Sequence, residues 1–272
     1  MAWFEGENMQ LYDKTQKLVT TGLMTALITV ATMVIAIPVP FTNGYIHMGD
    51  SMIFLAVLIL GWKHGAFAAG VGSALADLFL GYVHWAPWTL CIKALMAVVM
   101  GLIIQQCMKN KKFTALFSII IAIIWGGFNI IVQRIVIYEA TANAANLYEE
   151  AGVSTSSEFG DFINGIQSQL MLIALIIPVL LIIISFVVRK KEHIIIPVYQ
   201  IVAMTATGLW MVFGYYIAGG IIYGNFAVSA FSIPANMLQF LGGFFIAVIL
   251  AGALYKTPAK KYFTYKTMSI EK

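Results

Sequence analysis

The sequence predicts an all-α integral membrane protein, a polytopic helical bundle with about eight transmembrane helices in one membrane domain covering residues 1–272. Of its 272 residues, 61% are hydrophobic and only 10% are charged, about half the charged fraction of a soluble domain. Apolar stretches recur along the chain, and the basic residues stand in short clusters between them. Such a chain has more apolar surface than a water-facing shell tolerates, so a bilayer is its expected solvent.

The predicted spans follow from length, because crossing the hydrocarbon core takes roughly 20 apolar residues at a rise of about 1.5 Å each. They are residues 16–38, 48–62, 65–82, 87–107, 114–138, 167–188, 195–223 and 231–255. The first stretch is too long for a secretory signal and lacks a cleavage signature, so we expect its helix to be retained. The short second span follows residues 38–44, where two prolines and a glycine prevent continuous helix. Irregular backbone at that depth is stable only beside a protein cavity or at the surface.

The basic residues predict the orientation. With an even number of spans, both termini and alternate loops share one side, and the clustered lysines and arginines all fall on it. These are Lys14, Lys17, Lys63, Lys109, Lys111, Lys112, Arg189, Lys190, Lys191, Lys256, Lys260, Lys261, Lys266 and Lys272. The positive-inside rule makes that side cytoplasmic in a multi-pass protein of the cell membrane. The opposite loop, residues 139–167, carries Glu139, Glu149, Glu150, Glu158 and Asp161 but no basic residue.

Several function classes are not expected. Cys91 and Cys107 lie inside apolar segments without C-x-x-C spacing, which indicates neither a disulfide framework nor a metal site. The lysines do not form one nucleic-acid-binding face. There is no H-E-x-x-H, G-x-S-x-G or phosphate-loop motif and no cluster of histidine and cysteine. We therefore predict no enzyme, no ATPase of its own and no cofactor.

Polar residues at one depth predict a ligand pocket. An ionised side chain near the bilayer centre costs about 3 kcal/mol or more unless it is paired or hydrated. The polar residues within about two turns of the external helix ends are Asp50, Asp77, Lys93, Asn129, Gln133, Arg134, Asn236 and Gln239. Aromatic and polar residues at the same level are Asn43, Tyr45, His47, His84, Trp85, Trp88, Tyr215 and Tyr216. Apolar walls with a few polar anchors are typical of an outward-facing binding pocket.

Structural explanations of these residues remain open. Asp77 and Lys93 form a structural ion pair in one alternative, and Asn236 and Gln239 hydrogen-bond neighbouring helices in another. Arg134 can instead extend to water from its place near a helix end. An interfacial belt is the alternative for the aromatic residues Tyr82, Trp85, Trp88, Tyr138 and Tyr223.

Small residues predict two close helix contacts. A smooth face with spacings of three and four residues is formed by Gly65, Ala68, Ala69, Gly72, Ser73 and Ala76. It indicates internal packing against a neighbouring helix. Gly22 and Ala26 make a small-xxx-small pair on the first helix, which serves either internal packing or the docking of a partner protein.

Three ordered motifs carry a resemblance to a known family. They are residues 44–51 (GYIHMGDS), 70–82 (GVGSALADLFLGY) and 85–94 (WAPWTLCIKA). Together they resemble the S components of energy-coupling factor (ECF) vitamin transporters. Residues 211–216 (MVFGYY) and 233–239 (IPANMLQ) are similar to that family's last two helices.

The resemblance implies a subunit that captures a vitamin or a vitamin precursor outside the cell with high affinity. Its energy would come from two ATPase subunits and a transmembrane coupling protein, onto which Gly22 and Ala26 would dock. Family members usually have six helices. The implied core is residues 15–107 and 203–255, and residues 113–190 are an inserted helical pair with the acidic external loop. No family role carries over to Asn129, Gln133 or Arg134, which belong to that insert.

The implied pocket lies toward the outside and is gated by the loop at residues 38–49. The expected substrate-binding residues are Asp50, Asp77, Trp85, Trp88, Lys93, Tyr215, Asn236 and Gln239. Aromatic side chains would stack on a flat ring while amide groups hydrogen-bond the polar atoms at its edge. This favours a pyridoxine, pyrimidine or flavin compound. Alternatively, Lys93 meets a carboxylate, as in pantothenate. The alternative function is a self-sufficient secondary transporter, which would work without an ATPase module.

Overall fold

The structure is a computed structural model of the chain. It describes residues 2–39, 44–110, 112–144, 147, 152–153, 155–190 and 197–265, with the side chains of 2–13 and 180–190 left out. Some residues named in the sequence analysis lie outside the described residues or have side chains that are not described. They are Asn43, Lys111, Glu149, Glu150, Arg189, Lys190, Lys191, Lys266 and Lys272.

The predicted polytopic all-α architecture is confirmed. Within the described residues, seven candidate spans are long and apolar enough to cross a membrane. The long helices are α1 (Ala2–Val34), α2 (Gly49–Leu80), α3 (Ala86–Lys109), α4 (Lys112–Ala142), α6 (Ser156–Lys190), α7 (Val198–Tyr223) and α9 (Ile233–Tyr255). Shorter elements are β1 (Ala36–Val39), β2 (Gly44–His47), α8 (Phe226–Ala230) and the 3₁₀ helix η1 (Pro258–Tyr262).

Helix α2 contains a reversal of the chain at Gly61, which has φ +76° and ψ 173°. A Cβ atom on Gly65 would lie only 3.2 Å from the Cα of Val57, whereas residues eight apart in a continuous helix are about 12 Å apart. The two legs of α2 therefore run side by side, as the separate predicted spans 48–62 and 65–82 require. The first leg is only about 18 Å long, which is short of the roughly 30 Å hydrocarbon core.

The chain's C-terminal segment caps this reversal. A helix end leaves backbone carbonyls without partners, and here the carbonyls of Leu58 and Ile59 receive the N–H of Thr264 at 3.0 and 3.1 Å. The hydroxyl of Thr264 also donates to Ile59 at 2.7 Å. Tyr255 donates its hydroxyl to the carbonyl of Tyr265 at 2.8 Å, which fixes the segment against α9. Hydropathy did not predict this contact, because the segment is polar and follows the last span.

Several helix boundaries differ from the predicted spans, and two of the differences have a clear local cause. The first span was expected to reach residue 38, but α1 ends at Val34 and β1 pairs antiparallel with β2, with Pro38 opposite Tyr45. Proline has no N–H for a helix ladder, whereas a two-stranded edge tolerates it. Helix α6 begins at Ser156 rather than 167, since Thr155 and Glu158 hydrogen-bond each other's backbone N–H at 3.2 Å. This capping box starts the helix in a polar segment.

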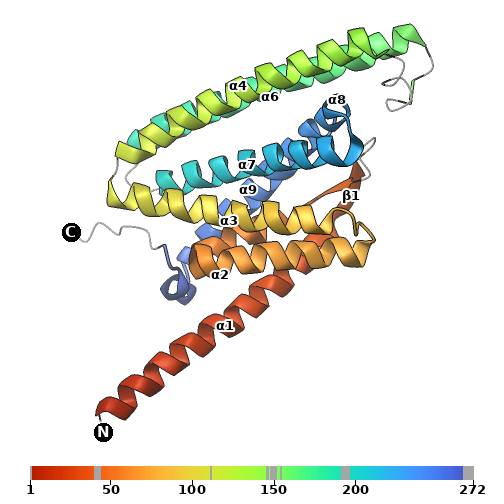
Figure 1. Cartoon of the computed structure of the whole chain (residues 1–272). Helices are drawn as coiled ribbons and strands as arrows, with labels where there is room; N and C mark the ends of the chain where they lie inside the picture. Colours follow the sequence, from red (N-terminus) through yellow and green to blue (C-terminus); the bar gives the residue numbers. More distant parts are fainter. Residues whose placement is uncertain are drawn as a thin grey trace.

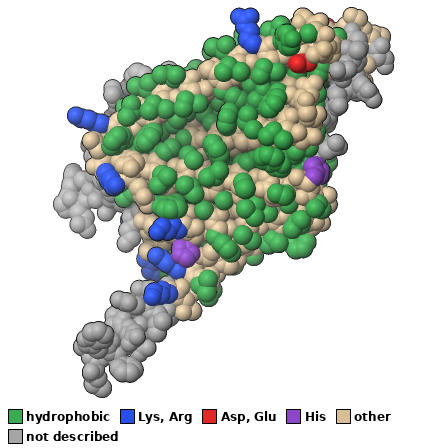
Figure 2. Space-filling view, viewed as in Figure 1, with side chains coloured by type: hydrophobic (Ala, Val, Ile, Leu, Met, Phe, Trp, Pro, Cys, Tyr) green, Lys and Arg blue, Asp and Glu red, His purple; other side chains and the backbone are tan. Residues whose placement is uncertain are grey.

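The helices form a bundle with two distinct ends (Figure 1). At one end lie the β1–β2 hairpin, α8 and the first turn of α3, and the start of α1 and the helix η1 lie toward the other. The two legs of α2 pack against α1, α3 and α9, and α3 packs against α7. The pair α4 and α6 covers the outer side of α7 and α9 (Figure 1). Basic side chains on the face in Figure 2 gather mainly toward the end opposite the hairpin.

The predicted small-residue face packs internally. A Cβ on Gly72 would lie 2.7 Å from the carbonyl oxygen of Thr25 on α1, and the hydroxyl of Thr29 donates to the carbonyl of Gly72 at 2.9 Å. On the opposite side of the same leg, a Cβ on Gly70 would lie 2.9 Å from the carbonyl of Leu90 on α3. The second leg of α2 thus lies close to both neighbours because it lacks bulky side chains there.

We expect Gly72→Ala to lower the free energy of unfolding by about 1–3 kcal/mol, because its methyl group overpacks the α1–α2 contact. Gly22→Ala is the matched control on α1. Nothing lies within 4 Å of a Cβ at Gly22, so this change should be neutral or stabilise the helix by up to about 1 kcal/mol. Thermal unfolding of the detergent-purified variants measures both effects, and equal melting temperatures would contradict this packing.

Candidate functional site

A pocket opens at the hairpin end of the bundle. Its empty volume is about 520 Å³, which includes the open mouth. It is lined by Val39, Gly44, Tyr45, His47, Asp77, Trp85, Thr89, Tyr215, Gly219, Tyr223, Ser232, Asn236 and Gln239. The lining thus comes from the hairpin and from the ends of α2, α3, α7 and α9.

The expected binding residues divide into two groups. Five of them line the pocket: Asp77, Trp85, Tyr215, Asn236 and Gln239. Asp50 and Lys93 are fully buried and are not part of the lining, and Trp88 is partly buried against the apolar core. Sequence reasoning missed Thr89 and Ser232. A signal existed for Thr89, which precedes Lys93 by one helical turn and so shares its face of α3.

The polar residues of α4 lie outside this pocket. Asn129 is buried, and its amide donates to the carbonyl of Trp125 one turn earlier at 3.0 Å. Arg134 is exposed on a wide, open groove between α4 and α8. A common depth therefore did not bring every polar residue to one site, because α4 packs on the outer side of α7.

Aromatic rings form much of the pocket wall. The ring of Trp85 meets those of Tyr215 and Tyr223 edge to face, with centroids 5.8 and 6.2 Å apart. Trp85 is only 8% exposed, which does not fit the interfacial belt that was its alternative. Tyr138, at 65% exposure, fits that belt. Packed rings of this kind present rigid faces to a flat ligand.

Asp77 and Tyr45 join the second leg of α2 to the hairpin. The hydroxyl of Tyr45 donates to Oδ1 of Asp77 at 2.6 Å. Burial, and then the charge of Asp77, raise the pKa of Tyr45 well above its ordinary value, so the phenol stays protonated as a donor. Oδ2 of Asp77 is buried without a hydrogen-bond partner among the described residues.

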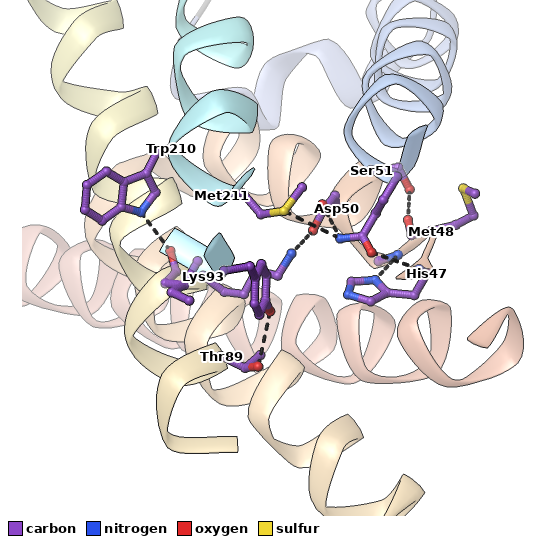
Figure 3. Close-up of polar contacts among 12 residues, drawn as sticks. His47, Met48, Asp50, Ser51, Thr89, Lys93, Trp210 and Met211 are labelled. Atoms are coloured by element: carbon purple, nitrogen blue, oxygen red, sulfur yellow. Dashed lines mark hydrogen bonds and ion pairs between the residues drawn. The ribbon is translucent and has the colours of Figure 1, made fainter. Parts of the chain in front are cut away.

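Behind the pocket lies a buried ion pair (Figure 3). Nζ of Lys93 is 2.5 Å from Oδ1 of Asp50, and neither side chain is exposed. The alternative pairing of Lys93 with Asp77 is wrong. Asp50 reaches this place because Gly243 on α9 has no side chain, and a Cβ there would lie 2.9 Å from that of Asp50.

Gln239 connects the ion pair to the hairpin. Its Nε2 donates to Oδ2 of Asp50 at 2.8 Å, and its Oε1 accepts the N–H of His47 at 3.0 Å. Gln239 thus makes an interhelical hydrogen bond and also belongs to the pocket lining. Asn236 instead donates to Ser232 within its own turn, at 3.3 Å.

His47 is a neutral imidazole at the pocket edge. Burial, followed by the positive charge of Lys93, lowers its pKa from 6.5 to about 3. Its Nδ1 accepts the N–H of Gly49 at 3.1 Å, so Nε2 carries the proton. In the described part of the chain, no three histidine, cysteine or acidic residues come together in a metal-binding group.

Removing one partner of the ion pair should be costly. We expect Lys93→Met to lower the free energy of unfolding by about 3–5 kcal/mol, since it leaves the Asp50 carboxylate buried without a counter-ion. The double variant Asp50→Asn with Lys93→Met removes both charges and should recover most of that loss. Thermal unfolding in detergent tests this, and additive losses would show that the pair is not coupled.

The pKa of His47 predicts acid sensitivity. Between pH 6.5 and 3 the unfolded chain binds more protons than the folded chain, so stability should fall as the pH falls through this window. The slope contributed is at most about 1.4 kcal/mol per pH unit. His47→Gln should flatten this slope, while His84→Gln, at an exposed position, should leave it unchanged. Melting temperatures across this pH range distinguish the two variants.

Known proteins match this chain at several levels. A family model described as "ECF-type riboflavin transporter, S component" matches residues 12–181 and 153–256. An "Uncharacterized protein in gap 3'region" of Pyrococcus woesei is 49% identical over 74 residues, which cover 27% of this chain and 49% of that protein. A UPF0397 protein of Streptococcus agalactiae is 30% identical over 110 residues, covering 39% of this chain and 60% of its own.

The matches to these curated relatives span about half to three-fifths of the relatives' length. No solved structure matches the chain significantly. The family model, by contrast, accounts for most of the sequence, including all the motifs that surround the pocket. This chain therefore belongs to the ECF-type riboflavin transporter S-component family.

Proposed function

We propose that this chain is the substrate-specific, high-affinity binding subunit of an ATP-driven ECF importer for a water-soluble vitamin or vitamin precursor. The observation that carries the proposal is the pocket at the hairpin end, where aromatic walls surround the buried polar groups of Asp77 and Gln239. A flat heteroaromatic ligand suits this lining, because its ring stacks on Trp85 and Tyr215 while amide and hydroxyl groups hydrogen-bond the polar atoms at its edge. Riboflavin, which the family's description names, belongs to this class.

Direct contact with the ligand is assigned to Asp77, Trp85, Tyr215, Asn236 and Gln239. The other three expected residues, Asp50, Trp88 and Lys93, act by holding these in place. Lys93 in particular is fully buried with its ammonium on Asp50. A ligand carboxylate, as in pantothenate, would have to break that ion pair to reach it, so the geometry favours the heteroaromatic alternative.

The α1 helix offers a docking face for the coupling protein and its two ATPase subunits. Gly22 and Ala26 are both exposed, next to the exposed apolar side chains of Leu18, Leu23 and Leu27. The N-terminal half of α1 diverges from the bundle (Figure 1). A smooth strip flanked by leucines suits close packing against another membrane helix.

The same proposal orients the protein in the cell membrane. The described lysines at the end opposite the pocket include Lys63, Lys109, Lys112 and Lys256, so the positive-inside rule makes that end and both termini cytoplasmic. The pocket then opens outward. Residues 113–190 are an insertion into a core of residues 15–107 and 203–255, packed against that core's outer side.

Energy dependence separates this proposal from its alternative, a secondary transporter. Purified alone, the chain should bind one vitamin of a panel, and a ligand at 100 times its Kd should add about 2.7 kcal/mol of stability. In proteoliposomes, uptake should require the coupling protein, both ATPase subunits and ATP. Uptake by the chain alone on an ion gradient would contradict the proposal.

Variants of the docking face separate ligand binding from ATP-driven uptake. The double variant Gly22→Leu with Ala26→Leu should keep its ligand affinity but lose ATP-driven uptake, because the bulky side chains separate α1 from the coupling protein. Placing leucines at Ile119 and Ile123, which are exposed on α4, is the matched control and should affect neither activity.

A further inference from the structure

Asp77 is the acidic residue of the pocket, and its surroundings leave one carboxylate oxygen free. The side chain is 4% exposed and belongs to the pocket lining. Oδ1 receives the Tyr45 hydroxyl, whereas Oδ2 has no hydrogen-bond partner among the described residues. A buried polar atom without a partner is costly. A ligand that donates to Oδ2 would remove that cost.

The described lining supplies no cation to balance Asp77. It contains neither lysine nor arginine. Lys93, the buried cation behind the lining, already pairs with Asp50 at 2.5 Å. The imidazole of His47 is neutral, and its Nδ1 is occupied by the N–H of Gly49. The phenol of Tyr45, which hydrogen-bonds to Oδ1 of Asp77, is neutral as well.

The pocket wall has the composition that favours a positive charge. The rings of Trp85, Tyr215 and Tyr223 meet edge to face around Trp85 and belong to the same lining as Asp77. Aromatic faces attract cations through their quadrupole, an effect worth about 2 kcal/mol or more in a desolvated site. In such a pocket the carboxylate attracts the charged nitrogen of a cationic ring, and the aromatic side chains attract the faces of that ring.

Resting on the proposed function, we propose that the ligand is a cationic nitrogen heterocycle whose charged or protonated nitrogen faces Oδ2 of Asp77. Its ring stacks against Trp85 or Tyr215, and Gln239 and Asn236 contact its polar edge. Carboxylated and phosphorylated vitamins are rejected, because a second negative charge near Asp77 is repelled in a low-dielectric site. Neutral flavins bind more weakly, since they leave the charge of Asp77 unbalanced.

A panel sorted by charge tests this inference on the wild-type protein. Thiamine serves as the cationic probe, riboflavin and pyridoxine as neutral probes, and pantothenate and nicotinate as anionic probes. Calorimetric titration in detergent should show thiamine binding at least ten-fold more tightly than the neutral probes, with no binding of the anions. Riboflavin or pantothenate as the preferred ligand would overturn the inference while leaving the proposed vitamin-binding function intact. A panel without any binding would contradict both.

Asp77→Asn then identifies the group responsible. It should weaken thiamine binding ten- to a hundred-fold without weakening any binding of the neutral probes, because the unbalanced charge that disfavours them is gone. Asp77→Glu should restore part of the affinity. Asp161→Asn, the same chemical change at an exposed residue of α6, should have no effect. Unchanged thiamine affinity in Asp77→Asn would overturn the inference, and if that variant fails to fold, the wild-type panel decides.

Discussion

The buried ion pair of Asp50 and Lys93 holds together the end of the bundle that forms the pocket. The two residues come from the first turn of α2 and the second turn of α3, and both are fully buried. Gln239 brings in α9 through the second oxygen of Asp50, and its carbonyl holds the backbone of His47 on the hairpin. In this low-dielectric setting water cannot replace a lost partner, so each element keeps its position only while the others do.

That network neutralises two of the charged side chains at this end of the bundle and leaves a third in the pocket lining. Asp50 and Lys93 neutralise each other, and burial keeps His47 neutral. The described lining is then left with hydroxyls, amides, aromatic rings and the carboxylate of Asp77. Asp50 and Asp77 lie at a similar depth but have different partners. Asp50 forms an ion pair with Lys93, whereas Asp77 accepts a hydrogen bond from the uncharged phenol of Tyr45.

The α1 helix is held differently from the inner helices. It packs against the second leg of α2, where Thr25 and Thr29 meet Gly72, while side chains such as Leu18, Val19 and Val34 remain exposed. Lipid can cover such a face. The smooth strip at Gly22 and Ala26, however, also allows a partner helix to approach closely, as the proposed docking of a coupling protein requires.

The sequence by itself determined the membrane class, most of the spans, the reversal near Gly61 and the level at which the polar residues gather. These follow from local properties, since hydropathy, helix length and glycine or proline positions are read within a few turns. Five of the eight expected binding residues line the pocket for the same reason, because depth is set by distance along a helix.

Only the tertiary structure decided that Lys93 pairs with Asp50 rather than Asp77, that residues 36–39 pair antiparallel with residues 44–47, and that Thr264 caps the end of the first leg of α2. These contacts depend on how each helix is rotated about its axis and on which segments are neighbours. Asp50 and Gln239, which meet behind the pocket, are 189 residues apart. Periodicity within one helix carries no information about such a pairing, because the partner's position is set by the packing of the whole bundle.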